Sequence, residues 1–286
     1  MPVARPAAWM TLASLALATL ALPAGVAAQT QNAATGVSSV LAAATSVTAT
    51  RSVAPPVLDG RDDDAVWKTA PTISGFQVYR PTEGGTPRLR TEAKVAYDAH
   101  DLYVFVRAYD PHPDSIVGLL TRSDAMTPSD EIAVFIAGSP DRRTGYEFDV
   151  NPAGVKMDAA IFQDGNEDMA WDGIWDVATR VDSLGWTAEF RFPFSQIRHA
   201  AEPSDTFGFT VARQVERTSE QSSWPIYSVS KPGLASQLGT LTALNDLAPP
   251  RRIELAPYLV TKNIEVPAGA GYGRSQRLTA GADLKV

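Results

Sequence analysis

Residues 166–177, NEDMAWDGIWDV, contain two tryptophans surrounded by acidic residues. Of all segments of this sequence, this one has the residue types most suited to binding or catalysis. Trp171 and Trp175 stand four positions apart, a spacing that puts both rings on one face of a regular element. Flat rings can stack on the C–H faces of sugars, while an amide such as Asn166 and a carboxylate such as Asp172 can bind sugar hydroxyl groups. The segment therefore predicts a ligand-binding patch, and ordinary packing under a loop is the alternative.

A third ring, Trp224, stands among polar residues at a strand edge, where burial alone explains a large aromatic side chain poorly. We add it to the candidate binding residues, with the alternative that such rings fold down onto the end of the domain. Trp67 and Trp186 are different. The first follows the turn Asp59-Gly60 and the second lies on an alternating apolar face, so both are expected in the core.

Oxygen-bearing side chains at alternate positions, Asp164, Asn166 and Asp168, resemble the start of a calcium loop. An EF-hand is excluded, because Met169 occupies the position of the turning glycine and Trp175 that of the bidentate glutamate. Calcium also accepts irregular oxygen cages. A looser calcium site in this loop is therefore one expectation, and a solvated acidic turn is the other.

No arrangement of residues in the sequence identifies an active site. The three histidines, His100, His112 and His199, are scattered, and there is no H-E-x-x-H, G-x-S-x-G or phosphate-binding glycine motif. A pair of glycosidase carboxylates would leave no local signature, because its members come from distant strands. No catalytic residue is therefore assigned, and intrinsic enzymatic activity is not expected.

The overall composition restricts the classes of partner. The 286 residues carry a formal net charge of −7 and are 44% hydrophobic, enough for one sizeable domain with a core. The sequence has no basic stripe to replace the counterions of phosphates, so nucleic acid is excluded as a partner. The absence of cysteine excludes thiol catalysis, Fe–S clusters and cysteine-type zinc sites.

The N-terminus is typical of an exported bacterial protein. Arg5 precedes an apolar run, and small residues before Gln29 suit a signal peptidase, so residues 1–28 are expected to be a signal peptide. Residues 29–50 contain no charged residue and no clear period, which predicts a flexible linker. The expected location of the protein is the periplasm or the outer membrane.

Short runs of alternating apolar residues, separated by turn residues, fill the middle of the chain. They predict strands near residues 93–97, 102–109, 132–136, 146–150, 175–181, 186–192 and 207–211. The segment from Phe194 to Ala200 suggests one helical turn. This pattern predicts an all-β fold, an antiparallel β-sandwich over residues 51–245.

Residues 246–286 have a different composition. A proline-containing linker is followed by two strand-like segments, Ile253–Val260 and Arg277–Val286, with a glycine-rich loop between them. Two strands with open edges are not stable alone. They are expected either to pair onto the sandwich or to be the first strands of an incomplete barrel.

Several motifs resemble family 9 carbohydrate-binding modules. The opening D-G-x-x-D-D-x-x-W occurs at 58–67, followed in the same order by K-V-A-Y-D-A-H-D-L-Y-V-F-V-R-A-Y-D, S-D-E-I-A-V-F-I, Y-E-F-D-V-N and G-W-T-A-E-F-R-F-P-F. The resemblance covers most of residues 51–244 and implies a β-sandwich. Two further motifs, N-P-A-G-V-K-M-D and W-D-G-I-W-D-V, are similar to exported bacterial proteins in which such a module precedes an outer-membrane β-barrel region of unknown function. That similarity implies that the chain is an N-terminal fragment.

Sugar-binding members of that family clamp a terminal sugar between two aromatic rings, with help from a Glu and an Arg. By position, Trp224 corresponds to the second ring, whereas the loop expected to supply the first ring contains Ala125-Met126-Thr127-Pro128. The helping Glu corresponds to Ala133 and the Arg to Asp149. The resemblance thus implies the fold of the family but not its sugar contacts.

The leading functional hypothesis is non-catalytic recognition of an oligosaccharide or polysaccharide within an exported, glycan-catabolising system. The competing hypothesis is a structural periplasmic or plug-like domain without a sugar ligand, in which Trp171 and Trp175 dock against the chain's own C-terminal barrel region. A third hypothesis is a protein associated with O-glycosyl hydrolases, since modules of this kind accompany such enzymes.

Overall fold

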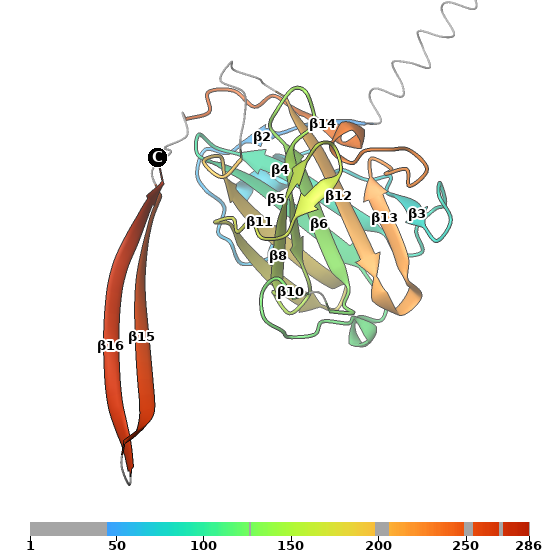
Figure 1. The fold of residues 1–286 in the computed structure, drawn as a ribbon. Helices are drawn as coiled ribbons and strands as arrows, with labels where there is room; N and C mark the ends of the chain where they lie inside the picture. The colour runs from blue at the N-terminus through green and yellow to red at the C-terminus, as the bar shows by residue number, and fades with distance from the viewer. Residues whose placement is uncertain (1–44, 126, 198–205, 249–253, 269–270, 286) are drawn as a thin grey trace, which may run out of the picture. The chain divides into compact units, whose positions relative to one another are not determined.

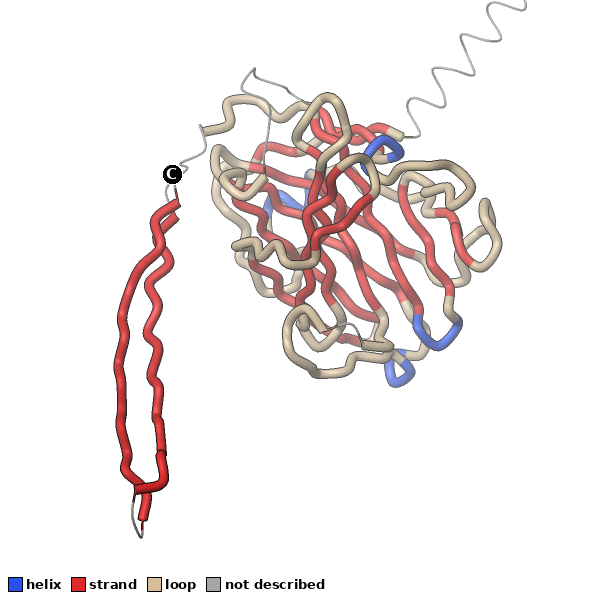
Figure 2. The backbone as a smooth tube through the Cα atoms, viewed as in Figure 1, coloured by secondary structure: helices blue, strands red, loops and turns tan. Residues whose placement is uncertain are grey.

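The computed structural model describes residues 45–125, 127–197, 206–248, 254–268 and 271–285. Strands dominate these residues, and two sheets pack face to face as the predicted β-sandwich (Figures 1 and 2). The predicted signal peptide, residues 1–28, and most of the predicted linker lie outside the described residues. Within the described ranges, no helix combines the length and the apolar character needed to cross a membrane.

The larger sheet has nine strands. Its main path runs β1-β14-β12-β6-β7-β8-β9, and β13 pairs with β12 and with β3. Its strands are β1 (Ser46–Thr48), β3 (Gln77–Arg80), β6 (Glu131–Ala137), β7 (Gly145–Val150), β8 (Lys156–Phe162), β9 (Asn166–Asp168), β12 (Phe207–Val215), β13 (Glu220–Trp224) and β14 (Gly239–Thr242). All of its pairings are antiparallel except that of β1 with β14.

The smaller sheet has five strands in the order β10-β11-β5-β4-β2. They are β2 (Thr50–Arg51), β4 (Thr91–Tyr97), β5 (Asp101–Tyr109), β10 (Asp176–Asp182) and β11 (Gly185–Pro193). The pairing of β2 with β4 is parallel. Because Ala49 alone separates β1 from β2, the N-terminal segment passes directly from one sheet to the other.

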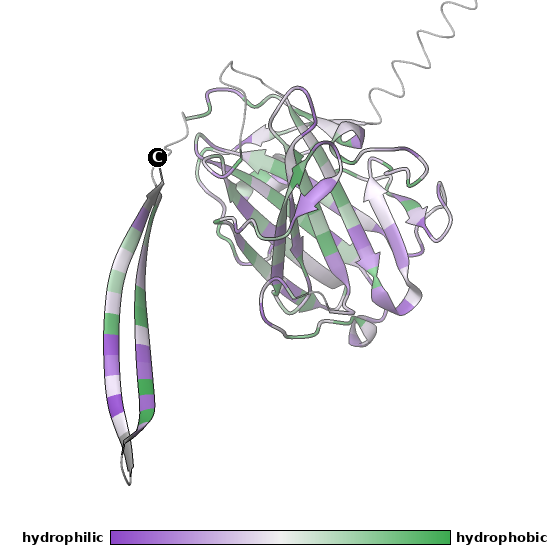
Figure 3. Cartoon of the chain, viewed as in Figure 1, coloured by the Kyte–Doolittle hydropathy of each residue, from purple (hydrophilic) through white to green (hydrophobic). Residues whose placement is uncertain are grey.

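Alternation decides which face of each strand is buried. In β6, Ile132, Val134 and Ile136 point into the interior and join one core cluster with residues of the smaller sheet. Apolar and polar residues alternate along these strands (Figure 3). Trp186 is fully buried in the same cluster, which confirms its predicted place in the core.

The outer face of the smaller sheet is covered by the short helix α2 (Ala65–Thr69), and this explains why β5 is apolar on both faces. Trp67 of α2 packs on Phe105, with ring centroids 5.8 Å apart. Its indole Nε1 donates a 2.9 Å hydrogen bond to the carboxylate of Glu189, which also accepts the backbone N–H of Gly60 at 2.9 Å. Gly60 has φ +76°, so the D-G turn places this N–H without strain. The prediction that Trp67 anchors the core is confirmed.

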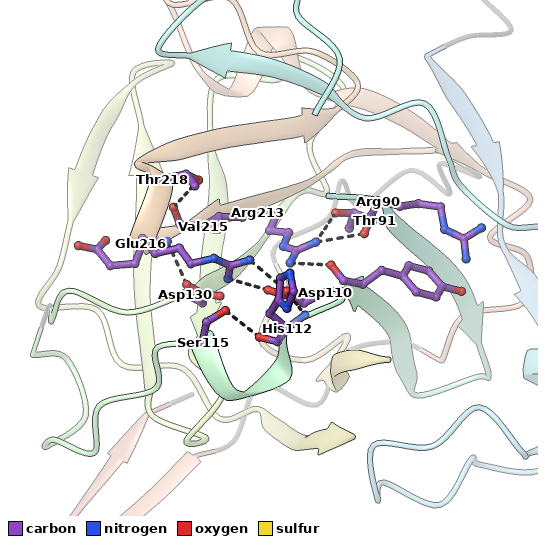
Figure 4. A network of polar contacts seen from close by, with 12 residues as sticks. Arg90, Thr91, Asp110, His112, Ser115, Asp130, Arg213, Val215, Glu216 and Thr218 are labelled. Carbon is purple, nitrogen blue, oxygen red and sulfur yellow. Dashed lines mark hydrogen bonds and ion pairs between the residues drawn. The ribbon is translucent and has the colours of Figure 1, made fainter. Parts of the chain in front are cut away.

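One buried cation links the two sheets. Arg213 of β12 is only 1% exposed. Its guanidinium donates to the carbonyl oxygens of Arg90 and Tyr109, both at 3.1 Å, and to the hydroxyl of Thr91 at 3.3 Å (Figure 4). Burial lowers the pKa of Arg213 to about 10, and the nearby carboxylate of Asp130 opposes that shift. The side chain therefore stays charged and ties the larger sheet to β4 and β5.

The N-terminal boundary of the sandwich differs from the predicted one. Residues 46–51, assigned above mostly to a flexible linker, form β1 and β2. Val47 and Ala49 are buried in the core, and the N–H of Ala49 donates to the carbonyl of Thr242 at 3.0 Å. The prediction is wrong here because two or three alternating residues do not stand out from an Ala/Thr/Val-rich background.

Several short elements also escaped prediction. They are β3, β8, β9, β13 and β14, together with three 3₁₀ turns, η1 (Pro113–Ser115), η2 (Glu216–Thr218) and η3 (Ala235–Gln237). The expected helical turn after Pro193 is present only as hydrogen-bonded turns up to Ile197, and residues 198–205 lie outside the described residues.

A long hairpin follows the sandwich in the sequence. It pairs β15 (Glu254–Ala268) with β16 (Gly271–Lys285) antiparallel along their whole lengths, so both strands are longer than predicted. Neither strand has another partner among the residues that the structure describes. Leu255, Leu259 and Leu278 are each about two-thirds exposed, so the hairpin carries apolar side chains in contact with solvent.

Candidate functional site

Trp175 is a core residue, contrary to the prediction that it lines an exposed patch. The side chain is 2% exposed and packs against Phe148 and Phe190, with centroids at 5.4 and 6.1 Å. Its Nε1 donates a 2.7 Å hydrogen bond to the carboxylate of Asp158, and the ammonium of Lys156 lies 4.6 Å from the ring centroid. The indole can be buried without loss because its one polar atom has a partner inside the domain.

Trp224 and Trp171 also lie mainly against the core. Trp224 is 7% exposed and faces inward from β13, with its ring 6.5 Å from that of Phe209. Trp171 is half-buried and packs on Tyr146 and Phe148, with centroids at 4.7 and 5.9 Å. The expectation of a solvent-facing patch of tryptophans is therefore wrong. The rings fold down onto the end of the domain, which was the stated alternative.

The remaining residues of the predicted patch are at the surface. Asn166 and Asp172 are both exposed. The side chain amide of Asn166 donates to Gln163 at 3.2 Å. Neither residue lines the outer-face pocket described below.

Two of the predicted calcium ligands, Asp164 and Asp168, accept hydrogen bonds from backbone N–H groups of loops. The carboxylate of Asp164 accepts the N–H of Ser236 at 2.7 Å, and the carboxylate of Asp168 accepts the N–H of Ala170 at 3.0 Å. Partial burial of Asp164 opposes ionisation, but the hydrogen bonds from Ser236 outweigh it and lower its pKa. Over the described parts of the chain, no three acidic or histidine side chains converge as a metal site would require.

A hollow lies on the outer face of the nine-stranded sheet. We call it the outer-face pocket, and its volume is about 200 Å³. Strands β3, β6, β7, β9, β12 and β13 contribute to it, together with the loop around η3. Its lining residues are Tyr79, Arg80, Phe135, Glu147, Glu167, Thr210, Ala212, Gln221, Ser223, Pro225, Tyr227, Leu234, Gln237 and Leu238.

Strand register explains why these side chains meet. Phe135 of β6 is paired with Glu147 of β7 on one side and with Thr210 of β12 on the other. The residues next to them along each strand, such as Phe148 and Val211, face the core, so this row must face outward. Small residues of the neighbouring rows leave room above the sheet.

Two tyrosines form an aromatic wall of the pocket. The rings of Tyr79 and Tyr227 lie 5.6 Å apart and nearly perpendicular, and both are half-buried. Burial raises the pKa of Tyr79 to about 12; the acidic groups Glu147, Glu131 and Asp149 add to that shift, and Arg80 opposes it. The hydroxyl of Tyr79 is therefore a neutral donor at physiological pH.

Two carboxyl groups, Glu147 and Glu167, line the pocket, and two more, Glu131 and Asp149, line a separate hollow of about 30 Å³. We call these four residues the acidic row. Burial raises the pKa of Glu147 to about 8, and the charges of Glu167 and Glu131 add to the shift. Asp149 is 2% exposed, and burial followed by repulsion from Glu147 raises its pKa strongly. The charge of Glu131 also adds to the upward shift of the pKa of Asp149.

These carboxyl groups lack the partners that other buried acids of the domain have. Both oxygens of Asp149 are buried without a hydrogen-bond donor. None of the ion pairs in the described part of the chain includes any of the four acids. Glu189, by contrast, accepts hydrogen bonds from Trp67 and from the backbone of the D-G turn. The acidic row therefore offers free acceptor capacity at the edge of a hollow.

One part of this site can be read from the alternation of the sequence. Glu147 and Asp149 are the polar residues that alternate with the apolar residues of β7, so their outward direction is predictable. Tyr79 and Tyr227 belong to a short edge strand and a loop, and no periodic pattern marks them. Only the tertiary structure brings them to the same pocket.

Comparison with known proteins places the chain in a family. A model of the family described as "Carbohydrate family 9 binding domain-like" matches residues 58–228. Among solved structures, a protein of Bacteroides uniformis to which carbohydrate binding is attributed has 12% identity and a TM-score of 0.55, over 69% of this chain and 98% of its own. No curated protein sequence matches significantly.

A family 9 carbohydrate-binding module from Caldicellulosiruptor kristjanssonii is also similar. It was solved in complex with cellotriose and with glucose, at 17% and 18% identity to this chain and a TM-score of 0.48 in each case. The similarity covers 69% of this chain and 92% and 94% of the module. The family model, which spans more than half of the sequence, decides the assignment: the chain belongs to the carbohydrate family 9 binding domain-like family.

Proposed function

We propose that this protein is a non-catalytic carbohydrate-binding protein that holds its ligand in the outer-face pocket. The observation that carries the proposal is the combination in one pocket of the aromatic wall, Tyr79 and Tyr227, with the carboxyl groups of Glu147 and Glu167. Ligand sites pair an apolar surface with a few polar groups that fix orientation. A sugar offers both a C–H face for the rings and hydroxyl donors for the acids. Membership of the family supports the same function.

The size of the pocket suggests how much of a glycan it holds. Its volume of about 200 Å³ is below the range of about 300–1,000 Å³ that is usual for drug-sized ligands. We therefore propose that it takes one terminal sugar of a longer chain, with the rest of the glycan in solvent.

Calorimetric titration with a panel of oligosaccharides tests this function. We expect a sugar-dependent heat for the wild type and at least a tenfold loss of affinity in Tyr79→Ala and in Tyr227→Ala, because each substitution removes half of the aromatic wall. Tyr258→Ala, at an exposed position of β15, is the matched control and should bind like the wild type. Absence of heat with every oligosaccharide would contradict the proposal.

A second candidate function is a structural role in the cell envelope, and the exposed apolar residues of the β15–β16 hairpin favour it. In this proposal the hairpin is the beginning of a barrel region in a longer protein, and the sandwich is its periplasmic or plug-like domain. Detection of the protein in detergent-extracted membranes, together with no affinity for any sugar, would support this candidate over the first.

We also propose that the protein is exported and takes part in glycan breakdown. The N-terminal residues 1–28, with Arg5 before an apolar run, support export. Cell fractionation of a tagged chain, compared with a variant lacking residues 2–28, tests it. The tagged chain should reach the envelope fractions and the truncated variant should stay in the cytoplasm.

A further inference from the structure

The charges at the outer-face pocket do not balance. Two of its lining residues, Glu147 and Glu167, are acidic, and Glu131 and Asp149 lie beside Glu147. Arg80 is the one basic residue among the lining residues, and its side chain is exposed. Its charge acts on Tyr79, whereas the charges that act on Glu147 are both negative.

We propose that this pocket binds saccharides carrying a protonated amino group in preference to neutral or acidic ones, an inference that rests on the proposed function. The acidic row lacks hydrogen-bond donors and a compensating positive charge, and a bound ammonium group would supply both. Sugar hydroxyls donate hydrogen bonds but leave the repulsion among the carboxyl groups in place.

Asp149 gives independent support for a cationic ligand. It is 2% exposed, and neither of its oxygens meets a donor from the described residues. It stands two residues from Glu147 on the same outward face of β7. Burial of an acid without a compensating charge favours its protonated form, and the pKa of Asp149 is accordingly raised strongly. A cation bound at Glu147 would favour the ionised form of Asp149 as well.

The aromatic wall fits the same ligand. Tyr79 and Glu147 line the same pocket, and the charge of Glu147 contributes to the raised pKa of Tyr79. An ammonium group held by Glu147 would therefore lie near the tyrosine rings, where cation–π attraction adds to the stacking of the sugar on the wall. A carboxylate-bearing sugar would meet repulsion at the same position.

Proton linkage gives a signature of this binding mode. Because burial and neighbouring acids raise the pKa of Glu147 to about 8, this group holds a proton in part of the free molecules near neutral pH. A bound cation favours the ionised carboxylate and lowers that pKa. Binding of an amino sugar should thus release a proton into the buffer, whereas binding of a neutral sugar should not.

The test uses calorimetric titrations of the mature chain at pH 6.5 with oligomers of glucosamine, N-acetylglucosamine and glucose, all with the same linkage. We expect the glucosamine oligomer to bind at least tenfold more tightly than the other two. Repetition in two buffers of different ionisation enthalpy should show proton release for that ligand alone. Glu147→Gln should abolish both the preference and the proton release, while Asp114→Asn, an exposed acid outside the pocket, should change neither.

Each outcome decides between defined alternatives. If the neutral oligomers bind as tightly as the amine and Tyr79→Ala weakens them, the amino-sugar inference is wrong and the proposed function stands. If no oligomer binds, both are wrong. If calcium chloride alone gives a binding heat that Glu147→Gln abolishes, the acidic row holds a metal and the inference is overturned. A cooperative melting transition for Glu147→Gln confirms that this variant is folded.

Discussion

Glu147 and Asp149 show how the same residue type acquires different properties within one domain. Both occupy ordinary outward positions of β7, yet each is surrounded by other acids and partly or wholly removed from solvent. Glu189 is as deeply buried as Asp149 but accepts several hydrogen bonds. Their sequence patterns are alike, but their environments differ. Glu147 and Asp149 therefore belong to a candidate ligand site, whereas Glu189 is a structural residue.

The acidic row predicts an unusual pH dependence of stability. The folded state raises the pKa of Glu147 to about 8, above its value in the unfolded chain, so the native protein binds more protons than the unfolded one across this interval. The free energy of unfolding should therefore fall as pH rises from about 4.5 to about 8. Thermal melts should show a midpoint several degrees lower at pH 8.5 than at pH 5.5, since 1 kcal/mol corresponds to about 2–4 °C in a domain of this size.

The variant Glu147→Gln checks the origin of that dependence. It should melt at a higher temperature than the wild type at pH 8.5 and show a weaker slope with pH. Asp114→Asn removes an exposed charge elsewhere and should keep the wild-type slope. A wild-type midpoint that rises steadily from pH 5.5 to 8.5 would contradict the raised pKa.

At the scale of elements, the two sheets are joined by polar contacts as well as by apolar packing. Arg213 reaches from β12 to backbone carbonyls next to β4 and at the end of β5. The segment that carries α2 is held by Glu189 of β11 in the same way. Of the two outer faces of the sandwich, that of the smaller sheet carries α2 and that of the larger sheet carries the pocket.

Arg213→Ala should strongly destabilise the protein without a direct effect on ligand binding. Removal of the guanidinium takes away one of the two cations near the buried Asp130 and breaks the hydrogen bonds to the carbonyl oxygens of Arg90 and Tyr109. Loss of one member of a buried charge network typically costs about 3–5 kcal/mol. Chemical denaturation should measure this loss. Arg274→Ala, in an exposed ion pair of the hairpin, is the matched control and should change the stability of the sandwich by less than about 1 kcal/mol.

At the scale of the whole molecule, the short N-terminal segment has more influence than its length suggests. Within six residues it adds a parallel strand to each sheet and buries Val47 and Ala49 between them. The larger sheet presents the pocket, whereas α2 covers part of the outer face of the smaller sheet, over Ala96, Tyr103 and Phe105.

A variant that begins at residue 52 should be less stable than one that begins at residue 45. Burial of Val47 alone accounts for about 1.5–3 kcal/mol, and backbone hydrogen bonds to β14 are lost as well. The melting temperature should fall by at least about 3 °C. Equal midpoints for the two variants would mean that β1 and β2 do not contribute to the fold.

The sequence by itself determined the class of the fold, because alternation in β6, β7 and β11 reports directly which side chains leave the solvent. It also located Trp67 and Trp186 in the core, since each sits in a periodic or turn context. The short strands β1, β3 and β9 and the irregular loops carry no such period, so their places in the sheets could not be predicted.

The tertiary structure decided the positions of the other rings and of the pocket. Trp175 and Trp224 have polar neighbours in the sequence, but their burial depends on side chains that lie far along the chain, such as Asp158 and Phe209. The pocket likewise combines Tyr79, Glu147 and Tyr227 from separate parts of the chain. The local sequence pattern predicts whether a residue is buried. Which residues it then contacts depends on strand order and register, and these are known only from the folded structure.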